Sequence, residues 1–209
     1  MGTEAPHVMR WTAACVASFG LLRIGELFPQ HPKAPIAMGD VRFYDSNYRL
    51  MKVSGSVDET GIWPDYLAIN LHVTKTDQHG VHPHHVISGA TAVRAMWRWC
   101  NHKQKCFNLP GDRFDILFQA RGHSPLTKVR LYRFVEECLF RCNNGTHIVG
   151  GKSFRRGGAS EAEARNLPRE LSAALGRWRS ESMLGVYSSE QAQTLKHIAI
   201  GRRIGSAPQ

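Results

Sequence analysis

The chain has 209 residues and carries 27 Lys and Arg against 17 Asp and Glu, a formal net charge of +10. This length suffices for one well-buried core, and the positive excess favours an acidic partner, with nucleic acid ahead of an anionic membrane surface. No apolar stretch approaches the roughly 18 residues of a membrane span, and five cysteines without a CxxC pair favour free thiols over a disulfide framework or a zinc site.

Two helices are predicted at the start of the chain. Apolar residues at helical spacing predict the first over residues 7–20, which Gly20 ends, and the second over 21–27. In the second helix Arg23 and Glu26 lie three positions apart and can pair. We expect Arg23 to be partly buried, since Leu and Ile flank it; taken alone, such an arginine is most often part of a structural ion pair.

A small antiparallel sheet is predicted next. Residues 41–53 are typical of one or two short strands, with Tyr44 and Leu50 as packing residues. A Gly/Ser/Asp-rich insertion over 54–64 follows. Residues 66–73 then alternate between apolar and polar side chains, which predicts a half-buried strand.

A turn over residues 74–80 and a return strand over 84–87 complete a β-hairpin, with Lys75 at or near its tip. Four histidines on or beside this hairpin suggest a metal site. Their spacing fits no zinc motif, no cysteine is near, and Pro83 interrupts the strand, so we expect surface histidines and no metal. These residues are His79, His82, His84 and His85.

The rest of the chain predicts helices. The helix over residues 90–103 is amphipathic, with Lys103 on its polar side, and Trp97 and Trp99 are expected as core and rim rather than as a stacking platform. The fold class is therefore α+β, a mostly helical domain with a small antiparallel three-stranded sheet at one edge. The later helices are expected from a cap at Ser124 or Thr127 to about 142, and over 152–165, 169–175, 180–186 and 189–204.

Residues 150–160 concentrate positive charge. Lys152, Arg155 and Arg156 share a face if this segment is helical. Residues 157–159 have almost no side chain, and because each glycine costs a helix about 1 kcal/mol relative to alanine, close packing must compensate. A cationic face on such a base suits a polyanion held in one pose; the simpler interpretation is a solvated helix face.

Five short motifs follow one another in a specific order. They are Leu-Leu-Arg-Ile-Gly-Glu-Leu at 21–27, Thr-Lys-Thr at 74–76, Lys-Ser-Phe-Arg-Arg-Gly at 152–157, Gly-Arg-Trp at 176–178, and Tyr187. Each is weak alone, but the ordered set, with Tyr187 nine residues after Trp178, resembles the catalytic domain of tyrosine recombinases, the phage-integrase family. The resemblance covers roughly residues 8–200.

The resemblance implies cleavage of double-stranded DNA without metal, ATP or another cofactor, through a 3′-phosphotyrosine that preserves the bond for rejoining. Tyr187 would be the nucleophile; the alternative is a core aromatic residue. Arg23 and Arg155 would bind the non-bridging phosphate oxygens with their forked guanidinium groups. Lys75 would protonate the departing 5′-oxygen, and Trp178 would hold a phosphate oxygen through its indole N–H.

The supporting residues implied by the resemblance include one departure. Lys152 stands where the family usually has His; a lysine can contact a phosphate, but it needs a depressed pKa to act as a base. His147 is an alternative for that role. Glu26 would orient Arg23. Further DNA contacts are expected from Arg156, Arg177, Arg179 and His79.

The family usually has an N-terminal helical domain that closes round DNA, yet only 22 residues precede Arg23. We therefore expect residues 1–209 to be a single catalytic domain, either a fragment or a chain that relies on a partner. Residues 189–204 would dock on a neighbouring copy, giving a homo-oligomer on DNA, or fold back. The expected location is intracellular and DNA-associated, in a nucleus or a nucleoid.

Three functions remain open, in this order of preference. The first is a site-specific recombinase or integrase, for example of a mobile element. The second is a relic that binds DNA without cutting it, which Lys152 and the missing clamp domain would favour. The third is a type IB topoisomerase-like enzyme, which would use the same residues to relax supercoiled DNA.

Overall fold

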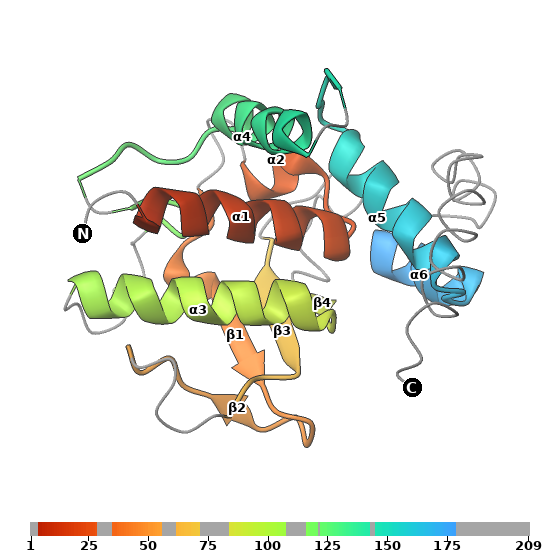
Figure 1. The fold of residues 1–209 in the computed structure, drawn as a ribbon. Helices are drawn as coiled ribbons and strands as arrows, with labels where there is room; N and C mark the ends of the chain where they lie inside the picture. The colour runs from red at the N-terminus through yellow and green to blue at the C-terminus, as the bar shows by residue number, and fades with distance from the viewer. Residues whose placement is uncertain are drawn as a thin grey trace, which may run out of the picture.

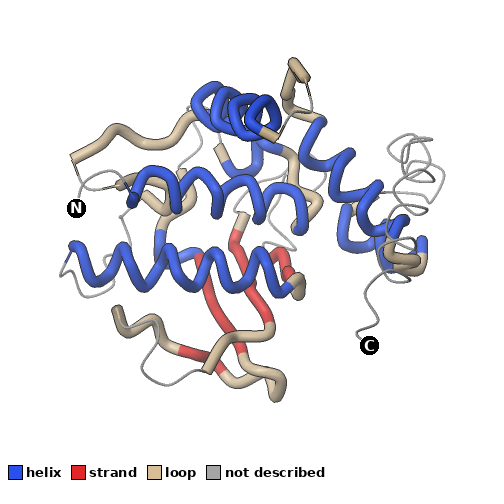
Figure 2. Tube along the Cα trace, viewed as in Figure 1, coloured by secondary structure: helices blue, strands red, loops and turns tan. Residues whose placement is uncertain are grey.

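A computed structural model describes residues 4–28, 35–55, 62–71, 84–107, 116–120, 122–142 and 145–178. Over these ranges the fold is α+β, with helices covering one face of a small antiparallel sheet (Figures 1 and 2). The helices are α1 (Glu4–Phe19), α2 (Ile24–Leu27), η1 (Met38–Asp40), α3 (Ala90–Phe107), α4 (Lys128–Arg141), α5 (Ser153–Ala164) and α6 (Arg169–Gly176). The strands are β1 (Val41–Tyr44), β2 (Leu50–Met51), β3 (Tyr66–Asn70) and β4 (His84–Ile87).

Within the described ranges the sheet contains four strands in the order β2-β1-β3-β4, all antiparallel. Of the one or two strands expected over 41–53, both form, so the sheet has one strand more than the three predicted. Phe43, Leu67 and Ile87 lie in register across three strands and are buried. Because side chains alternate between the faces of a strand, these residues define the face that meets the helices. Leu50 is 58% exposed, so its predicted packing role is wrong, and Phe43 fills that role.

Helix α3 packs against α1 and β3 and supplies much of the core (Figure 1). Trp97 and Trp99 are both buried, so the prediction that one of them lies at the rim is wrong. Lys103, predicted on the polar side, is also buried: its Nζ donates a hydrogen bond to the carbonyl of Ile116. The indole of Trp99 donates to the carbonyl of Leu117 at 2.8 Å. Backbone carbonyls of the segment after α3 thus satisfy the polar groups in this part of the core.

Helix α4 has a side-chain cap at its start. Helix α4 starts after Thr127, whose Oγ1 accepts from the backbone N–H of Arg130 at 3.3 Å; of the two predicted caps, the structure uses this one.

The described thiols are free, as predicted: Cys15, Cys100, Cys138 and Cys142. Among the described helices, none combines the length and the hydropathy needed to cross a bilayer.

Helix α5 crosses close to the C-terminal end of α1. A Cβ at Gly158 would lie 2.0 Å from the backbone oxygen of Ser18, so this contact requires a glycine. Ala159 is buried beside it. Gly157 is exposed, and a Cβ there would meet no atom within 4 Å, so the predicted close packing holds for Gly158 and Ala159 but not for Gly157.

The hairpin tip and the helices predicted over 180–186 and 189–204 lie outside the described residues.

Candidate functional site

The turn after α1 carries the first part of the site. The backbone N–H groups of Leu21 and Leu22 donate to the carbonyls of Ser18 at 3.1 Å and Ala17 at 3.0 Å. This is a Schellman helix end, in which the left-handed position usually belongs to glycine. Here Leu21 occupies it with φ 50°, at a cost of about 1 kcal/mol. Burial of the Leu21 side chain offsets that cost.

Arg23 follows this turn at the N-cap of α2 and is paired with Glu26. The Glu26 carboxylate accepts from the backbone N–H of Arg23 at 2.8 Å and from its Nη1 at 3.1 Å. The side chain of Glu26 is 5% exposed and that of Arg23 is 31% exposed. The predicted pairing and partial burial of Arg23 are therefore confirmed.

Arg155 reaches the same turn from α5. Its Nη1 donates to the carbonyl of Leu21 at 3.0 Å, and its Nη2 donates to the carbonyl of Gly176 at the end of α6. The guanidinium carbon lies 4.5 Å from the ring centre of Trp178, a cation–π contact. Arg155 is only 2% exposed, so it is a buried junction between α1, α5 and α6.

The prediction that Lys152, Arg155 and Arg156 share one face of α5 is therefore wrong. Lys152 and Arg156 are exposed, whereas Arg155 points inward with the buried residues Phe154 and Gly158. Lys152 is the N-cap residue, one position before the helix begins. Of these three residues, only Arg155 belongs to the buried cluster.

The end of α6 supplies the remaining side chains. Arg177 takes the left-handed position, with φ 52°, and its backbone N–H donates to Ala174 while that of Trp178 donates to Ala173, a second Schellman end. A Cβ at Gly176 would lie 2.2 Å from the Trp178 ring, so the ring can fold back only over a glycine. The turn aims Arg177 at α2, where its Nη2 donates to Glu26 Oε2 at 2.6 Å.

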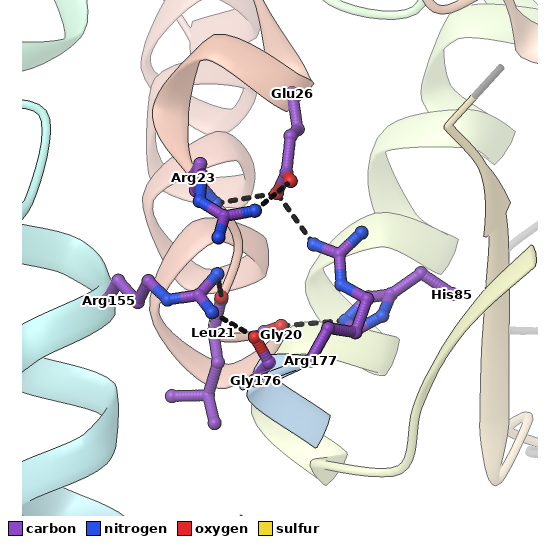
Figure 3. Close-up of polar contacts among 8 residues, drawn as sticks. All are labelled: Gly20, Leu21, Arg23, Glu26, His85, Arg155, Gly176 and Arg177. Atoms are coloured by element: carbon purple, nitrogen blue, oxygen red, sulfur yellow. Dashed lines mark hydrogen bonds and ion pairs between the residues drawn. The ribbon is translucent and has the colours of Figure 1, made fainter. Parts of the chain in front are cut away.

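Three arginines from three different elements therefore converge (Figure 3). Glu26 lies between Arg23 and Arg177, one carboxylate oxygen bonded to each side chain. Arg155 binds the carbonyl of Leu21, two residues before Arg23. Among the described residues the cluster has three guanidinium groups and one carboxylate, which gives it a net positive charge. Such a cluster can bind an anion with several oxygens in a fixed orientation.

His85 also belongs to the site, although we predicted no role for it there. It is 6% exposed, and its Nε2 lies 2.7 Å from the carbonyl oxygen of Gly20. Burial, with a further contribution from Arg177, lowers the pKa of His85 to about 4. The prediction of a surface histidine is wrong for this residue. The available signal is the two-residue period of the strand, because His85 shares a face with the apolar Ile87.

The other predicted site residues lie outside the described part of the chain: Lys75, His79, Arg179 and Tyr187. Within the described part, no group of three or more His, Cys, Asp or Glu residues is placed to hold a metal ion.

The fold and the site together define an α+β protein with a net-positive arginine cluster at the meeting point of α1, α2, α5 and α6. Neither a scan against models of known protein families nor a search of curated proteins found a match to this chain.

Proposed function

We propose that the protein breaks and rejoins DNA strands through a 3′-phosphotyrosine intermediate, as tyrosine recombinases do. The observation that best supports this proposal is the position of Arg155, whose guanidinium binds the carbonyl two residues before Arg23 although the two arginines are distant in sequence. The resemblance to tyrosine recombinases implies that these two side chains meet at one phosphate.

The exposure of the three arginines suggests an order of contact. The side chains of Arg23 and Arg177 are 31% and 22% exposed, while Arg155 is buried below them. A DNA phosphate would therefore meet Arg23 and Arg177 first, and Arg155 would add its charge from beneath. Two or more guanidinium groups at a phosphate stabilise the extra charge that its oxygens carry in the transition state.

The proposed reaction needs a nucleophile and a general acid. The Tyr187 hydroxyl would release its proton to water, and its oxygen would attack phosphorus, forming the phosphotyrosine bond while the bond to the 5′-oxygen breaks. Lys75 would give its proton to that leaving oxygen, and Lys152 would contact the phosphate. Rejoining is the reverse, with a DNA 5′-hydroxyl displacing the tyrosine. The bond energy is conserved, so the reaction consumes no external energy source.

A DNA-binding relic is the second candidate. Both Nη atoms of Arg155 donate to backbone carbonyls, and Lys152 is exposed at the helix N-cap. If Arg155 offers no further N–H to a bound phosphate, the cluster would bind the phosphate without activating it. The partner in either case is double-stranded DNA, and we propose a homo-oligomer on DNA through residues 189–204.

The test is covalent trapping on a library of nicked duplexes of random sequence. The wild-type protein is expected to form a protein–DNA adduct, which Tyr187→Phe should abolish. Arg155→Lys should reduce it by at least about 100-fold, because lysine cannot reproduce two forked hydrogen bonds. The matched control is Tyr48→Phe, at a tyrosine that is 72% exposed in the turn between β1 and β2, and its adduct level should equal that of the wild type.

An undiminished adduct with Tyr187→Phe would refute the nucleophile assignment. Salt-sensitive binding without any adduct would favour the relic. Relaxation of a plasmid without any target site would instead favour the topoisomerase-like alternative.

A further inference from the structure

Strand β4 contacts the turn that carries the arginine cluster. Gly20, the last residue before the left-handed Leu21, is buried, and a Cβ there would lie 2.7 Å from Cδ1 of Ile87 and 2.6 Å from the carbonyl oxygen of Val16. The absence of a side chain at Gly20 thus lets β4 approach the backbone of the turn. His85, two residues before Ile87 and on the same face, reaches the Gly20 carbonyl.

The hydrogen bond fixes the protonation of the ring. A carbonyl oxygen only accepts, so Nε2 of His85 must carry the proton and donate it to Gly20. The charged groups that face the ring come from three elements: Arg177 after α6, Arg155 in α5 and Glu26 in α2. The two arginines and burial disfavour a second proton, and outweigh the opposing effects of Glu26 and the Gly20 carbonyl.

We propose that His85 is a positioning residue for the arginine cluster: its Nε2–H holds the Gly20 carbonyl and thereby fixes the left-handed turn that presents the Leu21 carbonyl to Arg155 and carries Arg23. The next peptide after Gly20 contains that Leu21 carbonyl, which accepts from Arg155 at 3.0 Å. A rotation of the turn would move this acceptor and the backbone N–H of Arg23 together, breaking contacts with both Arg155 and Glu26.

The same contact connects the cluster to the hairpin. Strands β3 and β4 pair with Ile69 opposite His85 and Asn70 opposite His84, and residues 71–83 connect them. Lys75 lies in that connection. Strand β4 contacts the turn through His85, and it also follows directly after the segment that contains the proposed general acid. His85 therefore couples the position of β4 to the positions of Arg23 and Arg155. The effect of His85 on catalysis rests on the proposed function, whereas its effect on the turn does not.

Three variants separate positioning from simple space filling. His85→Gln keeps an N–H donor for the Gly20 carbonyl, and His85→Leu fills the space without a donor. His123→Leu is the matched control, at an exposed histidine in the segment before α4. The loss of one buried hydrogen bond of about 1–1.5 kcal/mol corresponds to about a 10-fold effect.

The first readout is NMR of the Arg155 guanidinium protons, which are expected to exchange slowly with water in the wild type because they are buried and bonded. His85→Leu should accelerate this exchange about 10-fold, whereas His85→Gln should stay within about 3-fold of the wild type and His123→Leu should match it. The rate of adduct formation on nicked DNA should follow the same order. Unchanged exchange in His85→Leu, or equal loss in the Gln and Leu variants, would overturn the proposal.

A third measurement needs no variant. The ¹⁵N shifts of His85 in the wild type should report a neutral ring protonated at Nε2 at pH 7, and a ring protonated at Nδ1 would overturn the proposal even if both variants fail to fold. If the wild type forms no adduct, the proposed function fails, but guanidinium exchange and the ring shifts still test the role of His85.

Discussion

Within the described part of the chain, the carboxylate of Glu26 is the negative group that bonds both Arg23 and Arg177. Glu26→Gln removes its charge while keeping its size. The wild-type carboxylate accepts from the backbone N–H and Nη1 of Arg23 and from Nη2 of Arg177. An amide can offer only one oxygen, so its NH₂ group must face a donor at one of these positions. The ends of α2 and α6 then lose part of their connection.

The expected cost follows from burial. Removing one partner of a buried ion pair costs about 3–5 kcal/mol. Glu26 is 5% exposed, but the side chains of Arg23 and Arg177 are 31% and 22% exposed, so water recovers part of that loss. We therefore expect a loss of about 2–3 kcal/mol in the free energy of unfolding. For a domain of this size that corresponds to a Tm lower by about 4–12 °C.

Urea and thermal unfolding of Glu26→Gln, with Glu137→Gln as the matched control, measure this cost. Glu137 pairs with Arg141 four residues later, but their side chains are 57% and 73% exposed. An exposed pair on a helix contributes about 0.3–0.5 kcal/mol, so the control should lose no more than about 2 °C. If both variants unfold within about 1 °C of each other, Glu26 does not hold the cluster together and the reasoning is refuted.

Further predictions concern the glycines and the pH dependence. Gly158→Ala should destabilise the protein by about 1–2 kcal/mol in urea unfolding, since overpacking exceeds the gain in helix propensity, whereas its neighbour Gly157→Ala should stabilise it by up to about 1 kcal/mol; equal signs would contradict the assigned contact. Gly176→Ala should displace the Trp178 ring and shift its fluorescence, and an unchanged spectrum would contradict the close approach. Because folding lowers the pKa of His85 from 6.5 to about 4, the unfolded chain binds the extra proton first; stability should fall by up to about 3 kcal/mol as the pH drops from 6.5 to 4, and His85→Gln should reduce that loss.

The longer described helices follow from the sequence because their apolar residues recur at helical spacing over several turns. Strand β2 has two residues, too few to show a period, which is why the sequence leaves open whether residues 41–53 form one strand or two. Leu50 in that strand illustrates the same limit: on a short edge strand, an apolar side chain gives no indication of which face it occupies.

The residue types of the site could be predicted from the sequence, but the directions in which its side chains point could not. The spacing of Lys152, Arg155 and Arg156 allows a shared face. The packing of Gly158 on α1 decides which side of α5 is buried, and Arg155 lies on that buried side. Likewise, Arg177 reaches Glu26 only because it adopts a left-handed conformation, which local sequence does not require of an arginine.

Histidine clusters invite one common interpretation for all their members. The hairpin histidines are close in sequence, yet His85 is buried against Gly20, and its parity with Ile87 on β4 is the signal that distinguishes it.

The most direct test of the central claim is an experimental structure of the protein bound to nicked duplex DNA. We predict a backbone phosphate between the guanidinium groups of Arg23 and Arg155, with Arg177 close by. A complex in which DNA lies on another surface and no phosphate contacts Arg23 or Arg155 would contradict the claim.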